Sequence, residues 1–491
     1  MEPKAVFDIF AQINQVPRPS KHEERISQWL QSFAAEHGIE CVADEAMNVI
    51  MRVPATPGYE HHEGVILQAH MDMVCEKNSD VEHDFMTDPI QTYVDGEFLK
   101  AKGTTLGADD GIGISMALAA ITDPNLQHPA IECLFTVDEE TGLTGAMKLQ
   151  DGVLRSKRLI NIDSEDDGQI FIGCAGGIDT LAKMHYEPVK VESLKFKVER
   201  LAIRLSVSGL TGGHSGDDIN KGRANANQLL VWFLARIWPQ TELQLARIEG
   251  GNLRNAIARE AQAVLCVPMA YKEQIRIEWN HYVAQMESVF GEVEKDMRLD
   301  LETCDMPDTF IPADKAYRLI MALCECPHGM IAMSKEMPGL VETSTNLASI
   351  KMKEEDQSPM TNHQYFVEIN TSQRSSIEAS KHHLKWAVEQ ALSLACDEVT
   401  HGDGYPGWAP NPNSALLEVV RKAYKDLFKE EPQVLAIHAG LECGLFLEKY
   451  PYLDMVSIGP QMYGVHSPQE RLSIPSTERC YKWLCRTLQA L

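Results

Sequence analysis

The chain of 491 residues carries 45 Lys and Arg against 71 Asp and Glu, and its formal charge of −26 argues against nucleic acids and anionic membranes as partners. It contains no apolar run of about eighteen residues, which argues against a membrane span. Because one hydrophobic core stops growing at about 250–300 residues, we expect two domains.

The first part of the chain alternates between predicted helices and strands. Apolar residues at helical spacing predict a helix over 4–15, and Ser20 with Glu23 forms a predicted capping box for a helix over 20–37. Small and apolar residues predict a buried helix over 111–121. The predicted strands are 49–53, 64–70, 131–137 and 159–163. This alternation indicates an α/β layer with a mostly parallel sheet, in which ligands bind beyond the carboxyl ends of strands.

The pattern changes near residues 187–197, where a second block of elements begins. This block contains predicted strands at 200–208, 243–249, 298–303 and 364–369, and predicted helices at 224–238, 272–290, 315–323 and 376–395. The tail returns to alternation, with helices at 414–428, 440–449 and 476–491 and strands at 433–437 and 453–458. We therefore expect a four-stranded α+β domain over 188–398 to interrupt an α/β domain made of 1–187 and 399–491.

A histidine and an aspartate end the second predicted strand, in the sequence QAHMDMV. His70 and Asp72 are two residues apart, so on an extended segment they point to the same face. An imidazole beside a carboxylate suits zinc ligation, because the carboxylate fixes the tautomer and raises the basicity of the ring. Taken alone, such a pair is more often a hydrogen-bonded polar pair at a strand end.

Other acidic residues lie at the ends of predicted elements. Asp109 and Asp110 precede the helix 111–121, where capping of the helix N-terminus is an equal alternative to a ligand role. Further acidic residues and a second histidine follow the ends of predicted strands: Asp138, Glu139, Glu140, Asp163 and His466.

Two histidines and several carboxylates at the ends of different strands form the nitrogen and oxygen ligand set of a paired Zn²⁺ site. A bridging carboxylate lets two cations sit about 3.5–4 Å apart and share a hydroxide for hydrolysis. One further carboxylate must stay free of metal to take up and return a proton. The neighbours Glu139 and Glu140 can supply one of each role. The alternative for the whole set is a polar cleft without metal.

Five separated motifs resemble those of one protein family: HMDMV, GADDG, TVDEETGLTGA, NIDSED and VHSPQERL. The family is that of the co-catalytic di-zinc metallopeptidases, which includes aminoacylases, tripeptidases and dipeptidases, and the similarity covers essentially the whole chain. It implies a catalytic domain interrupted by a lid and dimerisation domain, two Zn²⁺ per subunit with Co²⁺ or Mn²⁺ as substitutes, and a homodimer through the inserted domain. Many relatives carry a Lys, which is not a ligand, where this chain has Gly111.

The resemblance also implies roles for residues of the catalytic domain. Asp109 would bridge the two ions and be followed by a cis peptide bond, Asp72 would orient His70, and Glu139 would be the general base. The implied zinc ligands are His70, Asp109, Glu140, Asp163 and His466.

The inserted domain and the tail carry further matches. His214, in LTGGHSGD, would stabilise the oxyanion of the tetrahedral intermediate, from its own subunit or from a partner subunit. Arg374 would bind the free carboxylate of the substrate, since a guanidinium pairs bidentately with a carboxylate. Asn255 and Gly440 would also contact the substrate.

The implied function is hydrolysis of unblocked dipeptides, including Xaa-His and β-alanyl-His, by a metal-bridging hydroxide with Glu139 as general base and then acid. A tripeptidase, an N-acyl amino acid hydrolase and a catalytically silent metal-binding scaffold are the alternatives. The chain start lacks the basic and apolar regions of a secretion signal, and its 12 Cys form no CxxC pair. These features favour reduced thiols and a cytoplasmic location.

Overall fold

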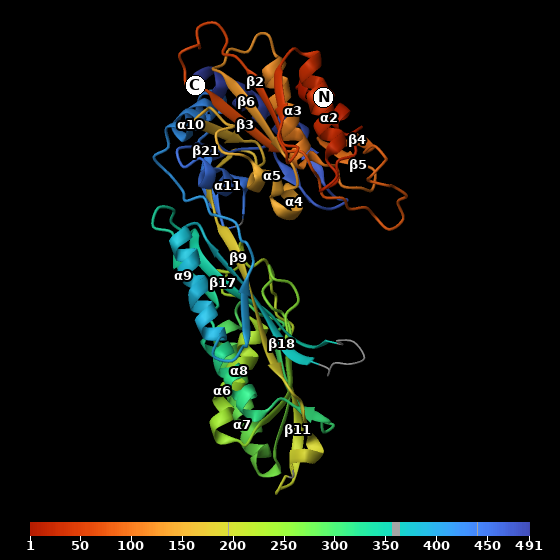
Figure 1. Cartoon of the computed structure of the whole chain (residues 1–491), viewed down its shortest axis with the longest axis vertical. Helices are drawn as coiled ribbons and strands as arrows, with labels where there is room; N and C mark the ends of the chain where they lie inside the picture. Colours follow the sequence, from red (N-terminus) through yellow and green to blue (C-terminus); the bar gives the residue numbers. More distant parts are fainter. Residues whose placement is uncertain (195, 356–363, 439) are drawn as a thin grey trace. The chain divides into compact units, whose positions relative to one another are not determined.

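The computed structural model describes residues 1–194, 196–355, 364–438 and 440–491. These residues form two compact units (Figure 1). Unit 1 consists of Met1–Cys174, Trp408–Ala436 and Leu441–Leu491, and unit 2 consists of Ala175–Gly407 and Ile437–Gly440. Among the described residues, no helix combines the length and the hydropathy that a membrane crossing requires.

Unit 1 is built on an eight-stranded sheet with the order β1-β2-β6-β3-β7-β21-β8-β20. Its strands are β1 (Glu40–Ala43), β2 (Val49–Val53), β3 (Val65–His70), β6 (Ile131–Thr136), β7 (Arg158–Asn161), β8 (Gln169–Cys174), β20 (Gln433–Ile437) and β21 (Asp454–Ser457). The four middle strands, β6, β3, β7 and β21, run parallel, and β1, β2 and β8 pair antiparallel. The predicted parallel arrangement therefore holds for the centre of a mixed sheet.

The middle strands are apolar because both of their faces are covered. Every residue of β3 and β6 is buried, as expected for strands at the centre of an α/β layer. The helices of unit 1 are α1 (Lys4–Ile13), α2 (Glu24–Glu36), α3 (Ala108–Thr122), α4 (Glu139–Gly142), α5 (Thr144–Lys148), α10 (Ala415–Phe428), α11 (Glu442–Lys449) and α12 (Ile474–Ala490). Almost all of α3 is buried between α1 and β3, which explains its small and apolar residues. A small sheet is formed by β4 (Thr92–Asp95), β5 (Phe98–Ala101), β22 (Met462–Tyr463) and β23 (Arg471–Ser473).

The predicted capping box before α2 is wrong. The helix begins at Glu24, and the side chain of its N-cap residue, Glu23, makes no capping hydrogen bond. Pro19 instead forms a parallel bridge with Met73, which places Ser20 beside Asp72. The Ser20 hydroxyl donates to Asp72 Oδ2 at 2.7 Å, so this residue holds another segment of the chain and does not cap its own helix.

Unit 2 contains a nine-stranded sheet, and the prediction of four strands is wrong. The order is β14-β11-β13-β12-β17-β18-β9-β19, and β16 pairs with β17. The strands are β9 (Gly176–Tyr186), β11 (Arg200–Ser208), β12 (Gln244–Gly250), β13 (Ala261–Pro268), β14 (Arg298–Cys304), β16 (Gly329–Met333), β17 (Val341–Glu355), β18 (Gln364–Ser375) and β19 (Glu398–His401). Because β9 pairs with β18 and β19, residues 176–186 belong to unit 2, although the sequence placed the boundary at 187.

Four long helices lie along one face of this sheet (Figure 1). They are α6 (Ala226–Ile237), α7 (Lys272–Phe290), α8 (Ala313–Glu325) and α9 (Glu378–Leu392), and all four were predicted. Shorter elements are the β10 (Val189–Lys190) and β15 (Thr309–Phe310) pair and 3-10 turns at Val191–Leu194, Trp238–Gln240 and Met269–Tyr271. The core of unit 2 lies between the helices and the sheet.

Candidate functional site

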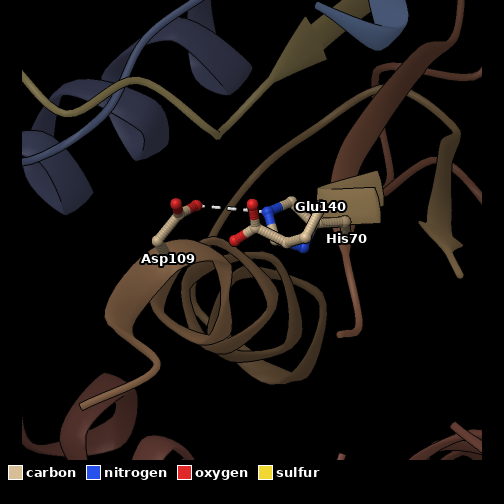
Figure 2. Close-up of side chains that lie close together, drawn as sticks. All are labelled: His70, Asp109 and Glu140. Atoms are coloured by element: carbon tan, nitrogen blue, oxygen red, sulfur yellow. Dashed lines mark hydrogen bonds and ion pairs between the residues drawn. The ribbon is translucent and has the colours of Figure 1, made fainter. Parts of the chain in front are cut away.

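Polar side chains gather at the carboxyl ends of the parallel strands of unit 1. His70 is the last residue of β3, and Asp163 follows β7 by two residues. The helix α4 opens with Glu139 and Glu140, shortly after the end of β6. Since β6, β3 and β7 are adjacent and parallel, their carboxyl ends meet at one edge of the sheet. Figure 2 shows His70, Glu140 and Asp109, at the start of α3, close together.

The carboxylate of Asp109 lies between two histidines from distant parts of the chain. Its Oδ1 is 3.1 Å from His70 Nε2, and its Oδ2 is 3.1 Å from His466 Nε2. Asp163 Oδ1 lies 3.5 Å from His70 Nε2, and Glu140 Oε1 lies 3.0 Å from His466 Nε2. The structure thus brings together all five predicted ligands, as two imidazole–carboxylate pairs that share Asp109. The peptide bond between Asp109 and Asp110 is cis, as the resemblance implied.

The protonation of this cluster follows from its crowding. Burial opposes ionisation of Asp109, but hydrogen bonds from His466 and His70 outweigh it and lower the pKa of the carboxyl group. Hydrogen bonds to Asp109 and Glu140 raise the pKa of His466 to about 11. Burial, together with the charge of Asp109, raises the pKa of Asp163 to about 6.

The cluster offers donor atoms of the kinds that bind divalent cations. Each of the three carboxylates lies within 3.5 Å of an imidazole Nε2 atom, and divalent metals such as Zn²⁺ take these donor types. His70 Nδ1 lies 3.4 Å from Asp72 Oδ1, which leaves Nε2 directed at the cluster. A carboxylate behind a ligating imidazole is the usual support of a metal-bound histidine. The residues therefore fit a pair of divalent cations.

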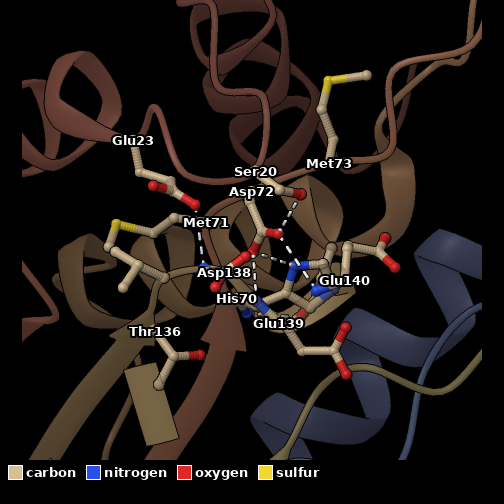
Figure 3. Close-up of polar contacts among 12 residues, drawn as sticks. Ser20, Glu23, His70, Met71, Asp72, Met73, Thr136, Asp138, Glu139 and Glu140 are labelled. Carbon is tan, nitrogen blue, oxygen red and sulfur yellow. Dashed lines mark hydrogen bonds and ion pairs between the residues drawn. The ribbon is translucent and has the colours of Figure 1, made fainter. Parts of the chain in front are cut away.

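Asp72 also holds the segment that carries the two glutamates (Figure 3). It is fully buried, its Oδ1 accepts from the backbone N–H of Glu139 at 3.0 Å, and its Oδ2 accepts from the N–H of Glu140 at 3.2 Å and from Ser20. The carboxylate of Glu23 accepts from the N–H of Asp138 at 3.0 Å. Ser20 and Glu23, which were predicted to form a capping box, instead position this segment. Their partners are distant in sequence, so local spacing could not reveal this role.

The Glu139 side chain is placed differently from that of Glu140. Among the described residues, none forms a hydrogen bond with the Glu139 carboxylate, whereas Glu140 bonds His466. Burial raises the pKa of Glu139 well above its ordinary value, and the charges of Asp163, Glu442 and Glu140 raise it further, against a lowering effect of His70. A carboxylate with a raised pKa and no fixed partner can accept and return a proton near neutral pH.

Unit 2 holds the other predicted residues, in two groups. In the first group, the His214 backbone bridges to Ala256, and the Ser215 N–H donates to the carbonyl of Asn255 at 2.8 Å. The ring of His214 is fixed through Nδ1, which lies 3.3 Å from the backbone nitrogens of Gly216 and Asp217. Its Nε2 makes no hydrogen bond among the described residues.

The second group lies around Arg374 on β18. This residue is 8% exposed, and its Nη1 donates to the Tyr405 hydroxyl at 3.2 Å. Gly440 packs on the same tyrosine, where a Cβ atom would lie 2.7 Å from the ring. His438 pairs through Nε2 with Ser344 Oγ at 2.7 Å, and burial, aided by the charge of Arg374, lowers the pKa of His438 to about 4. The structure thus brings Arg374 and Gly440 together, with a neutral histidine nearby.

Several known proteins resemble this chain over most or all of its length. The sequence matches the model of Peptidase family M20/M25/M40 over residues 66–490. It is 40% identical over 495 aligned residues to the cytosol non-specific dipeptidase of Escherichia coli (strain K12), covering 100% of this chain and 98% of that protein. The aminoacylhistidine dipeptidase from Vibrio alginolyticus superimposes with a TM-score of 0.93 and 38% identity, covering 100% of this chain and 97% of that one. Aminopeptidase PepT from Bacillus cereus shares the fold, with a TM-score of 0.62 at 16% identity and coverage of 99% and 98%.

Proposed function

We propose that this chain, which belongs to peptidase family M20/M25/M40, hydrolyses the peptide bond of unblocked dipeptides at a centre of two zinc ions. The observation that carries the proposal is the Asp109 carboxylate, which offers one oxygen to each of two imidazole–carboxylate pairs. The names of the Escherichia coli and Vibrio alginolyticus relatives, both dipeptidases, support the choice of substrate. Xaa-His and β-alanyl-His are among the substrates that we propose.

The ligands of one ion would be His70 and Asp163, and those of the other would be His466 and Glu140, with Asp109 shared. When bound, such a pair of ions supplies Lewis acidity towards the scissile carbonyl and lowers the pKa of water to about 7; Co²⁺ or Mn²⁺ can substitute.

The acid–base work falls to Glu139, whose carboxylate has no fixed hydrogen-bond partner among the described residues. It takes the proton of the attacking water and returns it to the leaving amine. Asp72 holds the backbone of Glu139 and the ring of His70, so it fixes the base relative to a ligand. A misplacement of the base by about 1 Å lowers the rate by about 10²-fold. Asp72 is fully buried and therefore well placed to hold the base in a fixed position.

Residues of unit 2 recognise the substrate in this proposal. Arg374 pairs with the free carboxylate, because its guanidinium is buried and offers Nε without a partner among the described residues. Asn255 and Gly440 contact the rest of the dipeptide. His214 donates from Nε2 to the oxyanion, since its Nδ1 is already held by the loop that carries it.

Two further statements belong to the proposal. The Escherichia coli relative is named a cytosol dipeptidase, which supports action in the cytoplasm. We also propose a homodimer through unit 2, which sedimentation of the intact protein tests directly; a monomer would contradict it.

The test of the activity is a panel of four substrates with metal-stripped protein, with and without added zinc. We expect zinc to restore cleavage of β-alanyl-His and Gly-Leu but not of N-acetyl-Leu or triglycine. Cleavage of N-acetyl-Leu or triglycine alone would point to an N-acyl amino acid hydrolase or a tripeptidase with the same metal site. Zinc binding without cleavage of any substrate would identify a silent scaffold.

A further inference from the structure

A buried arginine connects two of the loops that carry proposed metal ligands. Arg18 is 1% exposed, and its Nη1 donates to the carbonyls of Met71 at 3.2 Å and Asp72 at 3.0 Å. Its Nη2 donates to the carbonyl of Gly107. The first two carbonyls directly follow His70, and the third precedes Asp109 by two residues. One guanidinium therefore bonds the main chain of two loops that carry proposed ligands.

A buried glutamate holds the same segment from its other side. Glu470 is 3% exposed and accepts from three successive backbone N–H groups, those of Leu106 at 2.7 Å, Gly107 at 3.1 Å and Ala108 at 2.8 Å. Gly107 is thus fixed twice, because its N–H donates to Glu470 and its carbonyl accepts from Arg18. Glu470 follows His466 by four residues, so it connects a third ligand-bearing loop to the segment before Asp109.

Two glycines lie against the guanidinium of Arg18. A Cβ atom at Gly107 would lie 2.5 Å from Arg18 Nη2, and Gly107 has a φ of +68°, which an L side chain rarely adopts. A Cβ atom at Gly111 would lie 2.6 Å from the same nitrogen. The guanidinium of Arg18 therefore occupies space that a side chain at residue 111 would need.

We propose that Arg18 and Glu470 are positioning residues that set the spacing of the loops bearing His70, Asp109 and His466. The inference rests on the proposed metal centre, whose ligands these loops carry. A guanidinium has a rigid planar set of donors, and its three carbonyl partners can be bonded together only while the two loops keep one separation. Supports of this kind behind metal ligands are commonly worth 10–100-fold in metal affinity or activity.

The test measures zinc affinity by competition with a chelator, beside thermal unfolding of the metal-free protein. The variants are Arg18→Lys, Arg18→Met and the isosteric Glu470→Gln. We expect each to lower zinc affinity by about 10–100-fold at one or both sites. Arg18→Lys, which keeps the charge but not the fork of donors, should not restore the affinity.

Arg52 provides a matched control in unit 1. It bonds Glu40, Glu132 and the carbonyl of Val153, with a side chain 13% exposed, and none of these partners lies in a proposed ligand loop. Arg52→Met should lower the unfolding temperature and leave zinc affinity unchanged. If the Arg18 and Glu470 variants bind zinc as tightly as the unmodified chain, the inference is wrong. If the unmodified chain itself binds no zinc, the proposed function fails instead.

A double-variant cycle tests the contact with Gly111. Gly111→Ala alone should lower zinc affinity, because its Cβ displaces the guanidinium. In the Arg18→Met background, Gly111→Ala should reduce zinc affinity by a factor at least several-fold smaller, since the rigid guanidinium has been removed. If Gly111→Ala reduces zinc affinity by the same factor in both backgrounds, the proposed contact is wrong.

Discussion

The two carboxylate oxygens of Asp109 lie 3.1 Å from Nε2 of two different histidines, Oδ1 from His70 and Oδ2 from His466. These histidines are almost 400 residues apart in the chain, and one lies at a strand end while the other lies in a loop. A single side chain that faces both is the geometry expected of a carboxylate shared by two cations.

Replacing Asp109 should therefore affect both ions. We expect Asp109→Asn to lower zinc content from two ions per chain to one or none, because an amide offers one neutral oxygen where two charged ones are needed. Metal analysis after dialysis measures this. Asp95→Asn, at an exposed aspartate of unit 1 paired with Lys100, is the control and should retain both ions. Retention of two zinc ions by Asp109→Asn would exclude a bridging role.

Arg374 should control substrate affinity through the free carboxylate. We expect Arg374→Lys to raise KM for dipeptides by about 10-fold or more, since a lysine cannot form a bidentate pair. This increase in KM should largely disappear for substrates that end in an amide, which lack the carboxylate. Steady-state kinetics on matched acid and amide substrates checks this. Arg247→Lys, at an exposed arginine of the same unit, should change neither value.

His438 should make unit 2 sensitive to acid. Burial lowers the pKa of His438 to about 4, so the folded chain leaves it neutral at a pH where the unfolded chain, with a pKa near 6.5, takes up a proton. Above pH 6.5 this histidine is neutral in both states and does not reduce the free energy of unfolding. As the pH falls from 6.5 to 4, only the unfolded chain takes up the proton, so the free energy of unfolding decreases. At pH 5 this residue alone should lower the free energy of unfolding by about 2 kcal/mol relative to pH 7.

The measurement is urea unfolding at both pH values. In His438→Asn, the difference in unfolding free energy between pH 7 and pH 5 should shrink by that amount, whatever the stability of the variant at pH 7. His61→Asn removes an exposed histidine and should leave the difference unchanged. An unchanged difference in His438→Asn would show that this histidine titrates normally.

The fold of unit 1 could be predicted well from the sequence because its central strands are mostly apolar runs. Both β3 and β6 are buried on each face, and polar residues follow closely after each strand. The same short segment of sequence therefore indicates the strand and the site residues at its end. The pairing of Asp109 with His466 could not be derived from spacing, because it depends on the order of strands. It was implied by the resemblance to a family.

The sheet of unit 2 was predicted less well for a physical reason. β17 carries buried polar residues, among them Thr343, Ser344 and Asn346, so it lacks the apolar pattern by which strands are recognised. Such side chains can be buried because the fold brings them hydrogen-bond partners that are distant in sequence, as it does for Ser344 and His438. Arg18 was missed in the same way, because its partners are backbone carbonyls more than 50 residues away in the sequence.

We propose that Glu139 moves protons at a centre that it does not itself ligate. The direct measurement is turnover of β-alanyl-His or Gly-Leu by Glu139→Gln, together with its zinc content. We predict two zinc ions per chain, as in the unmodified protein, and a rate lower by about 10²–10⁴-fold, because an amide cannot accept the proton. Turnover at the original rate, or a loss of activity that simply follows a loss of zinc, would contradict this account.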